Sequence, residues 1–115
     1  MNNETKAAIG TPIAKDAKRE GAFYVSTLGE WTEISTPQSV WPVDANVIFK
    51  ATILKADPPA SWESSPVLPS AHTSAQMSVE KYLKPHLHRE IEFQYYVLDL
   101  GTETPSHTLK VRILP

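Results

Sequence analysis

An alternation of apolar and polar residues between Glu90 and Val97 constrains the fold of this chain more than any other feature of its sequence. The polar positions of this run alternate with four apolar ones, which are Ile91, Phe93, Tyr95 and Val97. Successive side chains of a β-strand point to opposite faces, so the pattern predicts a strand with one buried and one wet face. We expect this strand to run to Leu100, with a bulge near Asp99 where the alternation breaks.

Other segments show the same period of two. Residues 46–55 place an apolar set on one face, while the other face is half apolar and carries Ile48 and Leu54. Residues 108–113 alternate cleanly and should pair with residues 90–100 as an antiparallel hairpin. Short runs rich in aromatic and β-branched residues predict further strands at 23–28 and 31–34. Residues 74–84 fit either a strand or one helical face, and the flanking strands favour a strand.

These segments add up to six or seven strands with no long helix. That pattern predicts an all-β fold, an antiparallel β-sandwich. In layout it resembles an immunoglobulin-like or fibronectin-type-III-like sandwich, although the cysteine pair typical of antibody domains is missing. The chain of 115 residues has the usual size of one domain. We place this domain at 21–115, after a polar, flexible N-terminal tail at 1–20. The alternative for this tail is a first edge strand or a short helical turn around residues 14–20.

One segment interrupts the strand pattern. Residues 57–73 hold four prolines and several serines around a single large aromatic residue, Trp62. Proline removes a backbone donor and restricts the residue before it, so we expect a long loop without a regular ladder. An edge strand near Val67 and Leu68 is the alternative. Loops of this length are usually either functional or disordered.

Charge and cysteine content exclude several functions. The formal net charge is −2, and the few basic residues are scattered, so neither nucleic acid nor a membrane surface is an expected partner. The chain has no cysteine, which excludes disulfides, thiolate catalysis and cysteine-ligated zinc. Residues 1–20 contain no apolar run of signal-peptide length, so we expect a cytoplasmic protein.

One group of residues has the chemistry of a metal site. If residues 86–92 lie on a strand, then His86, His88, Glu90 and Glu92 project from the same face. Imidazoles and carboxylates together suit a divalent metal such as zinc or manganese. His107 lies across the predicted hairpin, from which it could approach the same face. The alternative is an ordinary wet strand face that binds no metal.

The stretch from Pro85 to Gly101 also resembles the first metal-binding motif of cupins. In that motif H-x-H is followed after three or four residues by Glu and then by an aromatic strand that ends in Gly. His86, His88, Glu92 and Gly101 occupy these places. The resemblance implies a small metal-binding protein that uses these side chains.

The aromatic residues point to a different kind of site. We expect Trp31 and Trp41 in the core or at its rim. Trp62, with Glu63, could be exposed on the proline-rich loop or could fold back over the sandwich as a lid. Exposed tryptophans often anchor protein or sugar ligands. Tyr96, on the polar face of the clearest strand, is a second contact candidate.

The sequence contains no nucleophile elbow and no complete catalytic motif. We therefore expect a non-enzymatic module that binds a protein partner or associates with itself, through an edge strand or the face carrying Ile48 and Leu54. A carbohydrate-binding module built on an exposed tryptophan is one alternative. A small metalloprotein is the other.

Overall fold

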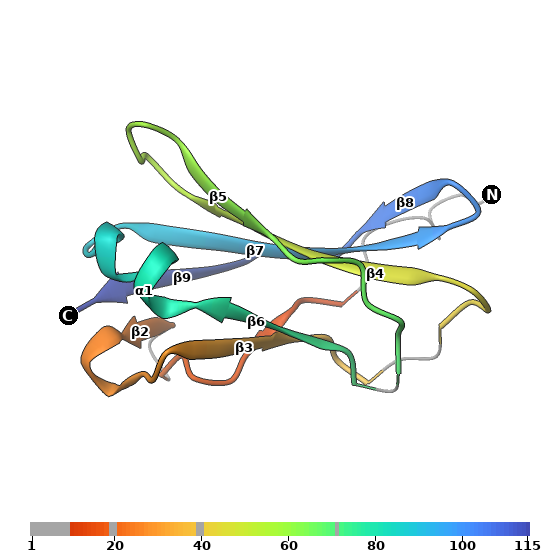
Figure 1. The fold of residues 1–115 in the computed structure, drawn as a ribbon, viewed down its shortest axis with the longest axis horizontal. Coiled ribbons are helices and arrows are strands. Elements are labelled where there is room, and N and C mark those ends of the chain that lie inside the picture. The colour runs from red at the N-terminus through yellow and green to blue at the C-terminus, as the bar shows by residue number, and fades with distance from the viewer. Residues whose placement is uncertain (1–9, 19–20, 39–40, 71) are drawn as a thin grey trace.

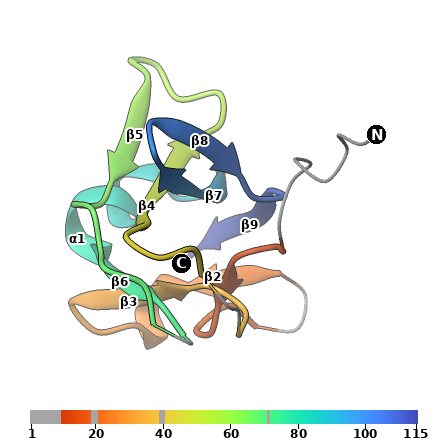
Figure 2. The ribbon, with the colours of Figure 1, turned by 90° about the vertical axis from the view of Figure 1, so that its right-hand side faces the viewer.

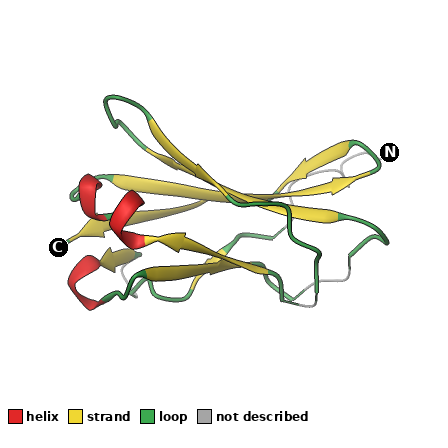
Figure 3. Cartoon of the chain, in the orientation of Figure 1, coloured by secondary structure: helices red, strands yellow, loops and turns green. Residues whose placement is uncertain are grey.

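A computed structural model of the chain describes residues 10–18, 21–38, 41–70 and 72–115. These residues form two β-sheets that pack face to face (Figure 1). Strands are the predominant secondary structure, and one short α-helix lies at one end of the sandwich (Figure 3). The predicted all-β sandwich is therefore confirmed.

The smaller sheet has three antiparallel strands in the order β1-β3-β6. Their bounds are Ile13–Ala14 for β1, Trp31–Ser35 for β3 and Ser74–Ser78 for β6. β1 lies within residues 1–20, the segment predicted to be a flexible tail. Its two residues, Ile13 and Ala14, pair with Ser35 and Ile34 of β3. Residues 1–9 and 19–20 of the predicted tail lie outside the described residues.

The larger sheet has the strand order β2-β9-β7-β4-β5, and β8 pairs with the far part of β7. Their bounds are Ala22–Tyr24 (β2), Asn46–Ile53 (β4), Ala60–Glu63 (β5), Glu90–Asp99 (β7), Thr102–Pro105 (β8) and Leu109–Leu114 (β9). β7 pairs with β9 in the predicted antiparallel sense. The described residues thus hold nine strands, rather than six or seven.

Two local predictions need correction. The larger sheet is mixed instead of purely antiparallel, because β2 runs parallel to β9. The proline-rich segment does contain a regular ladder: β5 pairs with β4 in the interval between Pro59 and Pro66, and Val67 then forms an isolated bridge to Val47. None of the four prolines lies within β5, so they remove no donor from its ladder.

Residues 74–84 form both a strand and a helix, the two structures that the sequence allowed. β6 ends at Ser78, and α1 (Val79–Tyr82) begins directly after it. The Ser78 hydroxyl accepts a hydrogen bond from the Lys81 amide at 3.1 Å, which is the typical role of a helix N-cap. A 3-10 turn, η3 (Lys84–His86), follows and leads into β7. The helical segment closes the end of the sandwich opposite the β7–β8 hairpin (Figure 1).

The core lies between the two sheets, and Figure 2 shows the gap that its side chains fill. The predicted apolar faces of β4, β7 and β9 all point into it, and the smaller sheet contributes Ile34 and Met77. Phe23 and Phe93 meet edge to face, with ring centroids 6.1 Å apart. A core of this kind leaves the outer sheet faces and the loops at the two ends as the surfaces on which a site can form.

Candidate functional site

Trp62, the predicted anchor, is not at the surface. Its Cα partner in the larger sheet is Ala51, and its side chain turns inward to the core, where it is only 8 % exposed. The alternation of β5 explains this, since Ser61 and Glu63 point outward on either side of Trp62. Trp62 is therefore a core residue and cannot contact a ligand in this structure.

Glu63 and Tyr96, the other two predicted contact residues, lie on the outer face of the larger sheet. Lys50 connects them: Glu63 is its cross-strand partner, and its Nζ lies 4.3 Å from the centroid of the Tyr96 ring. The Tyr96 hydroxyl donates a hydrogen bond to Gln94 Oε1 at 3.0 Å. The polar groups of this face thus largely bind one another, and Ile48 beside Tyr96 is already buried.

The predicted histidine pair does not lie on a strand. β7 begins at Glu90, while His86 ends the 3-10 turn that contains Pro85. Proline suits the first turn of such a helix, because its φ is preset and its missing amide donor is not needed there. His88 has a φ of +72°, and its amide donates to Ile113 O at 2.6 Å. The period-two argument therefore does not extend to either histidine.

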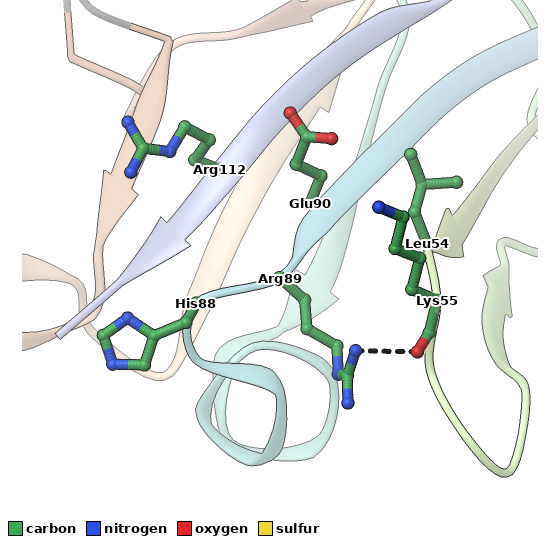
Figure 4. A pocket seen from close by; sticks show the side chains of 6 residues that line it. All are labelled: Leu54, Lys55, His88, Arg89, Glu90 and Arg112. Atoms are coloured by element: carbon green, nitrogen blue, oxygen red, sulfur yellow. Dashed lines mark hydrogen bonds between the residues drawn. The ribbon is translucent and has the colours of Figure 1, made fainter.

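His88 and Glu90 line an open hollow at the start of β7. We call it the cationic hollow; its volume is about 260 Å³, and it is lined by Leu54, Lys55, His88, Arg89, Glu90 and Arg112. The guanidinium of Arg89 donates to Lys55 O at 2.7 Å. Figure 4 shows that the charged groups spread apart instead of converging on one point. Three cationic side chains against one carboxylate repel a metal cation, so the hollow offers only a diffuse attraction for anions.

The remaining predicted ligands are elsewhere. Glu92 faces outward opposite Lys110 of β9, and His107 lies in the connection from β8 to β9. The His88 amide donates to the carbonyl of Ile113, and His107 precedes Ile113 by six residues, or about 20 Å of extended chain. Within the described ranges, no three histidine, aspartate or glutamate residues gather in a way that could hold a metal ion. The structure thus does not assemble the predicted metal site.

A surface that the sequence did not predict lies at the hairpin end of the sandwich. Of the large apolar side chains in the described residues, the three most exposed are Leu100 at 94 %, Val43 at 83 % and Leu68 at 78 %. The strand register places them at one end, since Asn46 at the start of β4 pairs with Leu98 near the end of β7. The bridge from Val67 to Val47 brings the third loop to the same end. We call this surface the apolar loop end, which consists of Trp41, Pro42, Val43, Leu68, Pro69 and Leu100.

A hydrogen bond and an aromatic contact hold Trp41 and its loop in place at the apolar loop end. The indole N–H of Trp41 donates to the carbonyl of Ser70, which joins the β3–β4 loop to the β5–β6 loop. The same indole packs edge-on against Tyr95, with ring centroids 6.3 Å apart. The two loops border an open hollow of about 420 Å³ between Trp41 and Leu68. A fixed framework lowers the entropy that ordering would cost on binding.

The hairpin tip carries the most unusual residue of this surface. Asp99 pairs with Thr102, so Leu100 and Gly101 form a two-residue loop, and both have positive φ, at +53° and +81°. This is the type I′ turn, which strongly favours Asn-Gly. Leucine is a poor choice for a left-handed position. Because this side chain is almost fully exposed, packing within the described residues does not compensate for its conformation.

Sequence reasoning missed this surface because three separate loops build it. Val43, Leu68 and Leu100 are single apolar residues among turn residues, and nothing in a linear pattern brings them together. One signal was available: in Asp99-Leu100-Gly101-Thr102 an apolar residue stands where a hairpin turn usually has Asn or Asp.

No protein-family model, no curated protein sequence and no solved structure matches the chain significantly. Among the described residues, the helices are all too short and too polar to cross a membrane.

Proposed function

We propose that this protein is a non-enzymatic binding module that holds a protein partner by its apolar loop end. The observation that carries the proposal is Leu100, a 94 % exposed leucine in a left-handed turn, at the same end of the sandwich as two other strongly exposed apolar residues. Residues in unfavourable backbone conformations cluster at functional sites, where the surroundings or a ligand compensate for them. A partner that covers Leu100 would supply that compensation.

The composition of the surface supports a protein partner. Clustered, highly exposed apolar side chains rimmed by polar residues are typical of protein interaction sites. Trp41 adds an aromatic group whose position is already fixed, and prolines stiffen the two loops beside it. Asp44 and Ser70 line the same hollow as Trp41 and Leu68 and supply polar groups at its border. Such a surface suits an apolar patch or an apolar helix of a partner better than a small polar ligand.

We also propose that the layout is immunoglobulin-like, as the sequence pattern indicated. The support is the strand order: β9-β7-β4-β5 resembles the G-F-C-C′ sheet of such domains, and β3 with β6 resembles their B and E strands. On that comparison, the apolar loop end corresponds to the end at which variable domains bind their ligands. The analogy of fold thus indicates the same end of the molecule as the exposed side chains do.

Two variants test the proposal. Val43→Ser, Leu68→Ser and Leu100→Asn are combined in the first, and Leu87→Ser, at the opposite end of the molecule, is the matched control. Each is used as bait in an extract of the source cells, and each is sedimented over a range of concentrations. A partner or self-association retained by wild type and control, but lost by the triple variant, supports the proposal. If bound proteins and mass are the same for all three, the apolar loop end is not the interface.

A further inference from the structure

Trp31 is the second exposed apolar anchor of the molecule, and it lies far from the apolar loop end. It begins β3 on the outer face of the smaller sheet, where it is 55 % exposed. Its neighbour Thr32 turns inward and is buried, and Ile34 follows in the same direction. Within the described residues, the Trp31 indole makes no hydrogen bond and no ring contact. A large aromatic ring is thus left available with an unused N–H donor.

The ring borders an open hollow of about 280 Å³ between β3, β6, the turn that follows β1 and the turn that precedes β3. Five polar side chains share the lining with the indole: Lys15, Asp16, Thr27, Glu33 and Gln76. We call this site the Trp31 hollow. Its volume is slightly below the range for drug-sized ligands, about 300–1,000 Å³, and therefore suits one or two small rings.

Internal contacts hold the polar groups of the hollow in place. Lys15 Nζ lies 3.5 Å from Glu33 Oε1, and the buried Thr32 hydroxyl donates to Asp16 Oδ2 at 2.8 Å. Glu33 and Gln76 are cross-strand partners, so a carboxylate and an amide stand side by side on the sheet. Each of these groups keeps further donor or acceptor capacity, because a carboxylate has about four acceptor sites and a primary amide has two donors.

The chemistry of this lining selects the class of ligand. A sugar hydroxyl both donates and accepts, so it needs acceptors and donors together, which Glu33, Asp16, Gln76 and Lys15 provide. The carbon–hydrogen face of a sugar ring packs well on the electron-rich face of an indole. Two carboxylates against one ammonium disfavour an anionic ligand, and this argues against nucleotides and acidic sugars. One tryptophan alone does not form the aromatic cage that a quaternary ammonium ligand requires.

We propose that the Trp31 hollow binds a neutral saccharide, with one ring stacked on Trp31 and its hydroxyls bonded to Glu33, Asp16 and Gln76. The site is separate from the apolar loop end, so the two proposals stand or fall independently. The hollow is open at Gly29, which also lines it, since a side-chain atom added at this glycine would meet nothing within 4 Å.

The test uses ¹⁵N-labelled protein and a panel of neutral oligosaccharides: cello-, xylo-, manno-, malto- and chito-oligomers at millimolar concentration. The three tryptophans give separate indole signals, which are assigned by single substitution. We expect at least one sugar to shift the Trp31 signal, while the buried Trp62 signal stays in place. Trp31→Ala should weaken that binding by about tenfold or more, and Glu33→Gln by a smaller factor.

Controls separate binding from folding and from the other site. Trp31→Tyr keeps an aromatic face and should retain part of the affinity. Leu68→Ser, on the apolar loop end, should bind the sugar as wild type does. The proposal is overturned if no neutral sugar moves the Trp31 signal, if only tetramethylammonium or glucuronate does, or if Trp31→Ala binds with unchanged affinity.

Discussion

Replacing Leu100 by Asn is expected to stabilise the fold and to weaken partner binding in the same protein. The left-handed conformation costs an ordinary L-residue about 1–2 kcal/mol, and Asn avoids part of that cost by bonding locally. The leucine side chain is 94 % exposed, so its removal loses almost no buried apolar area. We therefore expect a gain of about 1 kcal/mol, which in a domain of this size raises Tm by about 4 °C.

Leu100→Ala is the matched control for this prediction. It removes the same apolar surface, but alanine is no better suited to a φ of +53°. Its Tm should stay within about 1 °C of wild type. Differential scanning calorimetry gives the Tm of all three proteins. Capture of the partner from an extract measures binding, which should be weaker for both variants than for wild type. If Asn lowers Tm, or if alanine raises it equally, the leucine is not conformationally strained and the main support for the proposed interface disappears.

Three further predictions concern the core. Trp62→Ala should lower the free energy of unfolding by about 3–5 kcal/mol, because it leaves a cavity in the packed core. Trp31→Ala, at an exposed position, should lower it by less than about 0.5 kcal/mol. Urea unfolding measures both values, and equal losses would contradict the difference in burial between the two side chains. In the same assay, Ser106→Ala should lower the free energy of unfolding by about 1–3 kcal/mol, because the buried Ser106 hydroxyl accepts a hydrogen bond from the Tyr95 amide at 3.0 Å. A loss well below that range would mean that water replaces the hydroxyl. Burial raises the pKa of the Tyr95 phenol above its usual 10.0. Above that pH the unfolded state binds fewer protons than the folded state, so the free energy of unfolding falls as the pH rises. The free energy of unfolding of Tyr95→Phe should fall less steeply at alkaline pH, and a slope equal to that of wild type would contradict this.

The long strands could be predicted because their information is local. In β4, β7 and β9 an alternation of apolar and polar residues coincides with a buried and an outward face, and the bounds of β7 agree with the prediction to within one residue. The short strands β1 and β8 carry no such pattern, since two to four residues form a strand only where a neighbour supplies the ladder. Their existence depends on tertiary contacts.

The tryptophans show why the site was harder to predict than the fold. Prolines and serines around Trp62 predicted either an exposed side chain or a lid over the sandwich, but the alternation of β5 turns it inward to the core. Trp31 looked buried because it begins a strand, yet its parity places it outside. Adjacent residues of a strand point to opposite faces, and these short strands have no clear alternation of apolar and polar residues that would show which face is buried. The histidines failed similarly, because β7 starts two residues after His88.

The parallel pairing of β2 with β9 has a consequence for the order in which the chain folds. Ala22 is the partner of Arg112, about 90 residues away, and within the described residues β9 is the sole neighbour of β2 in its sheet. Closing so long a loop is entropically slow, and contacts of high sequence separation slow folding generally. The β4–β7–β9 ladder can form first, so the first strand of the larger sheet should be among the last to dock. Until it does, the edge of β9 stays open to pairing with another chain.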